Sequence, residues 1–185
     1  MTEKSVRGYA ITHAGEYLRQ EGGDQAIAAL SPALRQTLES AAAASWQPAA
    51  QMSEIFHAVA KLGKGDEAKA REHLEKCGEY QGMASSSTFL KLVMKVLTPS
   101  IFAKRVPTLW SRDSTVGAME VDLFDDHIVI RFKDTEPLEH LAPTVIGYHR
   151  FVMKQMGINV IRSELHGWSL SKPSSADLWF ASYWQ

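Results

Sequence analysis

Cysteine is almost absent from this chain of 185 residues, which has a single one, Cys77. One cysteine cannot form an intrachain disulfide, and it cannot supply a thiolate zinc site built from paired CxxC motifs. We therefore predict no metal site of that kind. The default role for Cys77 is that of a small hydrophobic residue packed inside a helical segment.

The chain also lacks an excess of either charge and any long apolar run. Lysine and arginine total 20 against 21 for aspartate and glutamate, which is not the composition of a general nucleic-acid binder. No run approaches the roughly 18 apolar residues of a spanning helix, and the first residues lack the apolar stretch of a signal peptide. We expect a cytoplasmic protein that neither inserts into a membrane nor binds nucleic acid.

Motifs of the common catalytic and cofactor sites are missing as well. The chain contains no HExxH, no Gly-x-Ser-x-Gly nucleophile elbow and neither glycine-rich phosphate loop. Its acidic pairs, Asp125 with Asp126 and Glu136 with Glu139, fall at turn and surface positions, where two carboxylates do not acquire different environments. The seven histidines are scattered, which is typical of structural roles. The sequence therefore predicts a protein that is not an enzyme and has no cofactor.

Helical spacing dominates about the first 110 residues, where capping residues and glycines predict the helix boundaries. Ser31 and Asp66 each precede a helical segment as an N-cap. Gly63 and Gly78 are expected to end the segments before them, as is the Gly22-Gly23-Asp24 turn. Several short helices follow from this punctuation.

The strongest helical stripe lies between residues 89 and 97 and ends at Thr98-Pro99, which breaks or restarts the helix. Its apolar positions recur at three-and-four spacing: Phe89, Leu92, Val93, Val96 and Leu97. A shorter helical segment with Phe102, Val106 and Trp110 follows it.

Near residue 115 the apolar period changes to that of extended chain. The patterns predict a hairpin that turns at Asp125-Asp126, a helix over residues 137–156 that stops at Gly157, and strands over 159–169 and 176–184. With 45% hydrophobic residues, the chain can bury a sizeable core. We predict an α+β fold in one domain, residues 1–185. A helical half, about 8–112, precedes a ββαββ part, about 115–185, with an antiparallel sheet.

This order of elements, with Val106-Pro107-Thr108-Leu109-Trp110 and the closing Asp177-Leu178-Trp179-Phe180, resembles one known superfamily. It unites heme-nitric-oxide-binding domains, vinyl-reductase-type ligand-binding domains and the TRAPP vesicle-tethering subunits. More narrowly, the whole chain, with Gly8-Tyr9 near its start, is similar to a paralogous family abundant in myxobacteria. The resemblance implies a sensing, binding or tethering module.

The resemblance also shows which features of its branches this chain lacks. The heme-binding branch has a proximal histidine in the helix before the sheet and a Tyr-x-Ser-x-Arg motif for the propionates. Residues 80–113 contain no histidine, and residues 119–123 have no Ser or Arg at the motif spacing. The cysteines that hold metal in the vinyl-reductase-type branch lie near the C-terminus, and none follows Cys77. We expect neither heme nor zinc.

The leading hypothesis is a non-enzymatic regulatory module that binds a small apolar molecule between the helical half and the sheet, as the resemblance implies. His149 is the most promising of the histidines because its helix should pack on the sheet. The candidate lining residues of this pocket are Phe89, Leu92, Val96, Trp110, His149 and Phe151.

The competing hypothesis is a protein-interaction module with a filled core. Residues 80–112 contain no acid and carry a net charge of plus five, which indicates either a solvated face or a docking surface for an acidic partner. Alternation in the last strand places Trp179 and Tyr183 on one face, as core or as the interface of a homodimer. The candidate interface residues are Lys91, Lys95, Lys104, Arg105, Trp179 and Tyr183.

Overall fold

The computed structural model describes residues 3–87, 92–136 and 138–185, which form the predicted α+β architecture. The helices are α1 (Gly8–Ala28), α2 (Pro32–Ser40), α3 (Ala49–Lys61), α4 (Glu67–Ser85), α6 (Pro99–Asp113) and α7 (Leu141–Gln155). The strands are β1 (Ser5–Arg7), β2 (Trp46–Pro48), β3 (Ala118–Leu123), β4 (His127–Lys133), β5 (Val160–His166) and β6 (Trp179–Trp184). The sequence patterns did not predict β1 and β2, which pair with each other.

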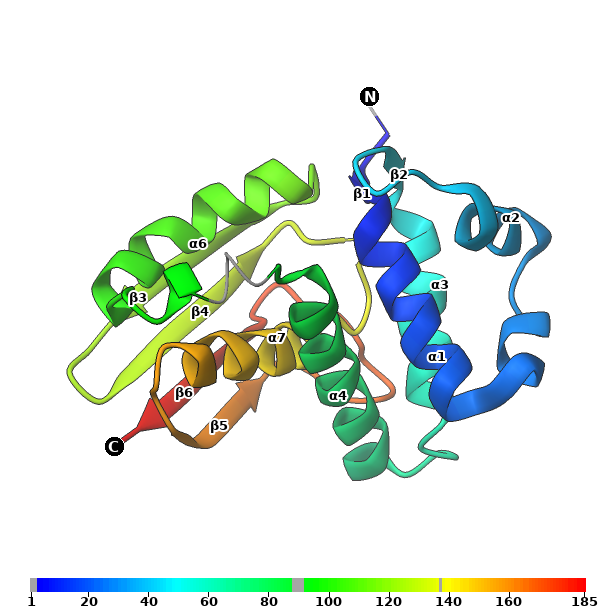
Figure 1. The fold of residues 1–185 in the computed structure, drawn as a ribbon. Coiled ribbons are helices and arrows are strands. Elements are labelled where there is room, and N and C mark those ends of the chain that lie inside the picture. Colours follow the sequence, from blue (N-terminus) through cyan, green and yellow to red (C-terminus); the bar gives the residue numbers. More distant parts are fainter. Residues whose placement is uncertain (1–2, 88–91, 137) are drawn as a thin grey trace.

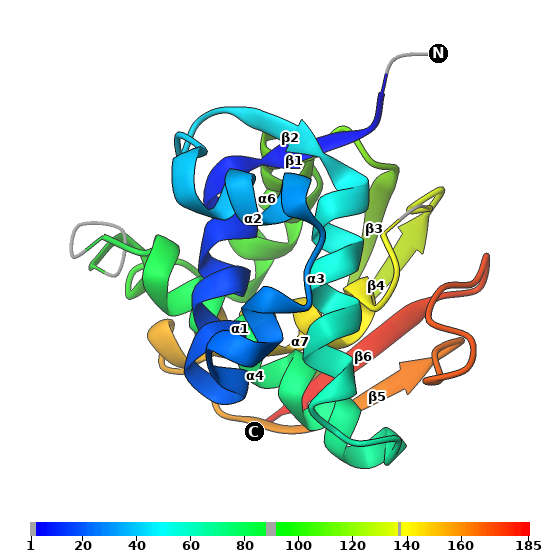
Figure 2. The same cartoon turned by 90° about the vertical axis from the view of Figure 1, so that its right-hand side faces the viewer.

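The main sheet has the strand order β3-β4-β6-β5 and is antiparallel throughout, which confirms the ββαββ tail. Ile130 of β4 pairs with Phe180 of β6, and both side chains are buried on the inner face. Helix α6 lies along β3 and helix α7 lies along β5 and β6 (Figure 1). In the turned view, α1, α3 and α4 lie in front of α7, and the strands of the main sheet lie to the right of these helices (Figure 2).

Helices α4 and α7 pack together very closely because each has a glycine at their contact. A Cβ atom added to Gly78 would lie 1.8 Å from the carbonyl oxygen of Thr144, and one added to Gly147 would lie 1.7 Å from that of Glu75. The prediction that Gly78 ends its helix is therefore wrong, since α4 continues to Ser85. Here glycine serves the close approach of two backbones.

The predicted N-caps are confirmed. Ser31 Oγ accepts a hydrogen bond from the Leu34 amide at 3.3 Å and starts α2. Asp66 Oδ1 accepts one from the Lys69 amide at 3.0 Å and starts α4. Each bond satisfies one of the amides that the first turn of a helix leaves unpaired.

The other predicted glycine stops have mixed outcomes. Gly157 has φ 79° and follows α7, as expected. After α3 the left-handed residues are Lys64 and Gly65, so Gly63 is not the stop. Gly23, with φ 69°, kinks α1 without ending it. A glycine in the sequence marks a special backbone position, but it does not distinguish a stop from a kink.

The helical stripe expected before Thr98 differs from the structure. Phe89 lies outside the described residues, whereas Leu92 and Val96 are 57% and 77% exposed and Met94 is buried. The reason is that the chain makes a tight turn, with Leu97 N bonded to Met94 O at 3.1 Å, instead of continuing a helix. Among the described residues of this stretch, Met94 is buried, and Met94 and Leu97 both line the cavity described below.

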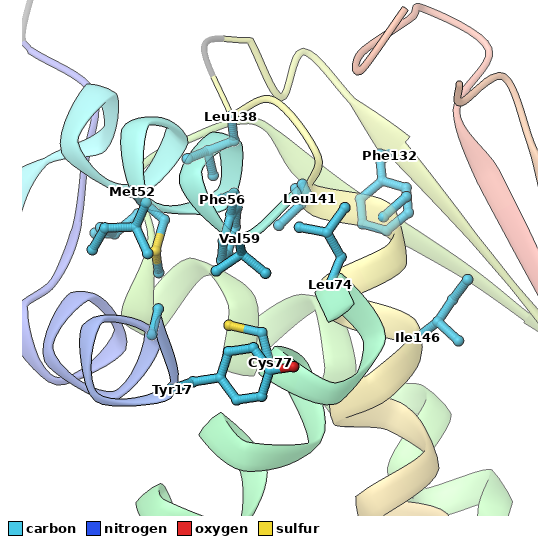
Figure 3. Packing of buried hydrophobic residues seen from close by; sticks show 14 of the residues in the cluster. Tyr17, Met52, Phe56, Val59, Leu74, Cys77, Phe132, Leu138, Leu141 and Ile146 are labelled. Carbon is cyan, nitrogen blue, oxygen red and sulfur yellow. The ribbon is translucent and has the colours of Figure 1, made fainter. Parts of the chain in front are cut away.

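One hydrophobic cluster extends from the helical half to the inner face of the sheet. Figure 3 shows Phe56 and Val59 of α3 near Leu141, with Cys77 of α4 beside Tyr17 of α1. Cys77 is fully buried, and burial raises the pKa of its thiol, so the expected packing role agrees with its position. Within the described ranges, no helix is long and apolar enough to cross a membrane.

Candidate functional site

A cavity of about 290 Å³ lies between the two halves of the fold. Its walls come from β1 and α1, from α3 and α4, from α6 and α7, and from the inner face of the sheet. Most of the lining side chains are apolar, such as Met52, Phe102, Val106, Met119 and Ile130. The cavity is thus where the helical layer and the sheet leave space between them.

Helix α6 forms one wall because its apolar positions recur on one face. Thr98 caps the helix by accepting a hydrogen bond from the Ile101 amide at 3.3 Å, and Pro99 occupies its first turn. Phe102, Val106 and Trp110 then fall at four-residue spacing, and all three line the cavity. The indole of Trp110 donates to the carbonyl of Val116 at 2.8 Å, which fixes the ring at the sheet end of the wall.

Helix α7 contributes the most unusual side chain of the cavity, His149. Its imidazole is 1% exposed, and neither ring nitrogen has a hydrogen-bond partner among the described residues. The rings of Phe102 and Phe180 lie on it with centroid separations of 5.7 Å. An unpaired buried polar group costs about 1–3 kcal/mol of stability.

The protonation state of His149 follows from its surroundings. Burial, and secondarily the charge of Arg150, lowers the pKa of His149 to about 3. At neutral pH the ring is therefore an uncharged imidazole, with one N–H donor and one bare nitrogen acceptor.

The other polar side chains of the described lining are committed elsewhere. Arg112 forms a two-pronged ion pair with Asp113 at 3.0 Å and 2.6 Å, and the hydroxyl of Tyr9 is hydrogen-bonded to Asp113. Gln81 donates to the carbonyl of Ala10 at 2.8 Å. Arg112 and Asp113 therefore offset each other's charge.

Ser114 and Thr144 also have hydrogen-bond partners, whereas Tyr148 is exposed to solvent. Ser114 Oγ accepts from the Val116 amide at 3.0 Å, and Thr144 Oγ1 donates to the carbonyl of His140 at 3.2 Å. Tyr148 lines the cavity but is exposed. Among the described lining residues, His149 is thus the buried polar side chain left without a partner.

A second polar cluster ties α3 to the start of α7 and to the loop before β6. His140 is fully buried, with Nδ1 3.3 Å from the indole nitrogen of Trp168 and Nε2 3.4 Å from Nδ1 of His57. Because an indole only donates, His140 Nδ1 accepts and Nε2 carries the proton. Burial, then the charge of His57, lowers the pKa of His140 to about 4. These contacts support the structural role expected of most histidines.

The structure places the six candidate pocket residues differently from one another. Trp110 and His149 line the cavity. Leu92 and Val96 are exposed and do not line it. Phe151 is buried on the other side of α7, where it contacts Gly82 of α4, and Phe89 lies outside the described residues.

The candidate interface residues lie on two surfaces. Lys95, Lys104 and Arg105 are exposed on and before α6, while Lys91 lies outside the described residues. Trp179 and Tyr183 are half-buried on the outer face of the sheet. There they stack on histidines of the neighbouring strands, at 5.2 Å from His166 and 4.9 Å from His127.

Several lining residues were missed from the sequence. Tyr9, Met52, Gln81 and Met119 come from four separate elements that only tertiary packing brings together. The one available signal was the repeat of Phe102, Val106 and Trp110 on a single helix face. In the described part of the chain, no group of three His, Cys, Asp or Glu side chains could hold a metal ion.

No family model and no curated protein matches the chain. Solved structures do match, along almost the whole length. An Fe(II) unliganded H-NOX protein from K. algicida has a TM-score of 0.69 at 10% identity, covering 97% of both chains. An H-NOX protein from S. oneidensis in the Fe(II)NO ligation state has a TM-score of 0.59 at 11% identity, covering 97% of this chain and 99% of the other. The chain therefore has the H-NOX fold, as the resemblance implied.

Proposed function

We propose that this protein is a non-enzymatic sensory domain that binds a small apolar molecule in the cavity between α6, α7 and the sheet. The observation that carries the proposal is the cavity itself, whose apolar walls enclose one buried and unpartnered imidazole. Cavities of this kind, mostly apolar with few polar groups, are typical of small-molecule sites.

The lining of the cavity supports an apolar occupant. The cavity opens to solvent, since its lining includes the exposed side chains of Leu109 and Tyr148. Most of the remaining lining is apolar, so an apolar molecule bound there would remove hydrocarbon surface from water.

Heme is the group that the structural neighbours suggest, since one of them is described through its heme redox potential. The described lining does not fit heme. Helix α6 contains no histidine, and His149 on α7 has Phe102 and Phe180 against its ring. The cation of the described lining, Arg112, is already paired with Asp113 and is not free for propionates. A cavity of about 290 Å³ is also slightly smaller than the usual range for small-ligand sites, about 300–1,000 Å³.

Binding can be tested with naphthalene, an apolar probe without polar groups, by equilibrium dialysis. Val106→Trp adds bulk to the α6 wall and should abolish binding, whereas Ile161→Trp on the exposed surface of β5 should leave it unchanged. Native mass spectrometry of the purified protein would show any retained molecule. The proposal is wrong if naphthalene does not bind, or if it binds equally to the Val106→Trp variant.

A second candidate function is self-association through the outer face of the sheet. Trp179 and Tyr183 point away from the helices there, stacked on His166 and His127. Partly exposed aromatic rows are favourable interface material. Exposed Lys95, Lys104 and Arg105 would suit an acidic protein partner on a different surface. Analytical ultracentrifugation at micromolar concentration tests the homodimer directly.

A further inference from the structure

The unpaired imidazole in the cavity defines the chemistry of the ligand beyond its apolar character. Resting on the proposed function, we infer that the ligand is a neutral molecule with an apolar body and one hydroxyl group, which hydrogen-bonds to His149.

His149 is the buried polar group that is free to bind. Tyr9, Arg112 and Asp113 satisfy one another, and Gln81 donates to a backbone carbonyl. Tyr148 is exposed at the surface. Both nitrogens of His149 are buried and without a partner, and an apolar ligand with no polar group would leave them so. A ligand with one matching group therefore has an advantage.

The site accepts a neutral ligand better than a charged one. Arg112 is held by Asp113 at 3.0 Å and 2.6 Å, so neither an anion nor a cation would find an unpaired partner of opposite charge in the described lining. Moving an uncompensated charge into apolar surroundings is very unfavourable. The imidazole itself is uncharged at neutral pH because burial disfavours its protonated form.

A hydroxyl matches a neutral imidazole better than a carbonyl does. The ring has one N–H donor and one bare nitrogen, and a hydroxyl can donate to the nitrogen or accept from the N–H, whichever edge faces the cavity. A carbonyl can only accept. The rings of Phe102 and Phe180 contact the imidazole at centroid separations of 5.7 Å, so they support its orientation and provide apolar surface for the ligand.

The test compares two probes of nearly the same shape, 1-naphthol and naphthalene, by equilibrium dialysis. The wild-type protein should bind 1-naphthol about tenfold more tightly than naphthalene. His149→Leu should reduce that ratio to about one while it still binds naphthalene. His166→Leu, the same exchange at an exposed histidine outside the cavity lining, is the matched control and should keep the tenfold ratio.

Each outcome separates this inference from the proposed function. If His149→Leu binds naphthalene and keeps the preference for 1-naphthol, or if His166→Leu abolishes that preference as well, the role of His149 is refuted and the apolar site stands. If neither probe binds the wild-type protein, the proposed function fails and the inference fails with it. If His149→Leu does not fold, the side-chain ¹⁵N chemical shifts of His149 in the wild-type protein test whether the ligand hydroxyl bonds to this ring. They should move with 1-naphthol and not with naphthalene, and equal responses refute the inference.

Discussion

Replacing Gly147 by alanine should destabilise the protein strongly, although alanine is the better helix former. In an exposed helix this exchange gains about 1 kcal/mol. At the α4–α7 contact, the new Cβ would lie 1.7 Å from the backbone oxygen of Glu75, where ordinary contact begins at 3.4 Å. A backbone oxygen cannot rotate away as a side chain can, so the two helices must separate. Overpacking typically costs 1–3 kcal/mol or more, and we expect a net loss of at least about 2 kcal/mol.

Gly82→Ala is the matched control on the same pair of helices. Its Cβ would meet the ring of Phe151 at 2.8 Å and the Cβ of Phe151 at 3.3 Å. This contact is with a buried side chain and not with backbone, so part of it can relax. The loss of stability should therefore be clearly smaller than for Gly147→Ala.

Urea unfolding followed by far-ultraviolet circular dichroism measures both variants. With a slope of about 1–3 kcal/mol per molar urea, a loss of about 2 kcal/mol should lower the midpoint of Gly147→Ala by about 1 M, and the midpoint of Gly82→Ala should fall by less. A Gly147→Ala midpoint equal to or above that of the wild type would show that the close contact of α4 with α7 is not what requires glycine there.

Four further outcomes are expected. Hemin titration should give no Soret band, and a band that disappears in His149→Ala would contradict the absence of heme binding. Cys77→Ser should cost about 1–3 kcal/mol without loss of ligand binding, and native Cys77 should resist a thiol reagent because burial raises its pKa. The free energy of unfolding should fall as pH drops from about 6.5 towards 4, by up to about 1.4 kcal/mol per unit for each of His140 and His149. Their pKa values in the folded protein, about 4 and about 3, lie below the value of about 6.5 in the unfolded chain. As the pH falls, the unfolded chain therefore binds protons first and is stabilised relative to the folded protein. A free energy of unfolding that does not change over this pH range would refute the expectation. Trp179→Asp should weaken a homodimer in sedimentation experiments, and a wild-type monomer would exclude one.

The sheet and its helix could be predicted because their apolar residues recur with a regular spacing, every second residue in the strands and every three to four residues in the helix. Alternation in the hairpin around Asp125-Asp126 became β3 and β4, and the spacing that ends at Gly157 became α7. Capping and glycine rules were less informative about which helices pack against each other. In the sequence, Gly78 looks the same as a glycine that ends a helix. Only the packing of α7 against α4 shows that this glycine allows two backbones to come close.

The lining residues of the cavity could be predicted only where a single helix contributes them. Trp110 and His149 line the cavity, and each was chosen from its place in a single helix. The same spacing predicts Leu92 and Val96, but both side chains are exposed. The chain turns after Met94, so the helical stripe ends before Val96. An apolar stripe predicts a buried face only if the helix continues, and the sequence does not say where a short helix ends.

The likeness to H-NOX proteins at 10–12% identity shows how little of a site a fold determines. Apolar spacing on α6, on α7 and along the sheet is enough to build the same two layers with a space between them. The chemistry of that space depends on a few side chains that the packing leaves free to vary. This chain has no histidine on α6 and a buried one on α7, and its cavity arginine is paired within the protein. The pairing of that arginine with Asp113 supports the neutral ligand proposed above, because it leaves no unpaired charge in the described lining.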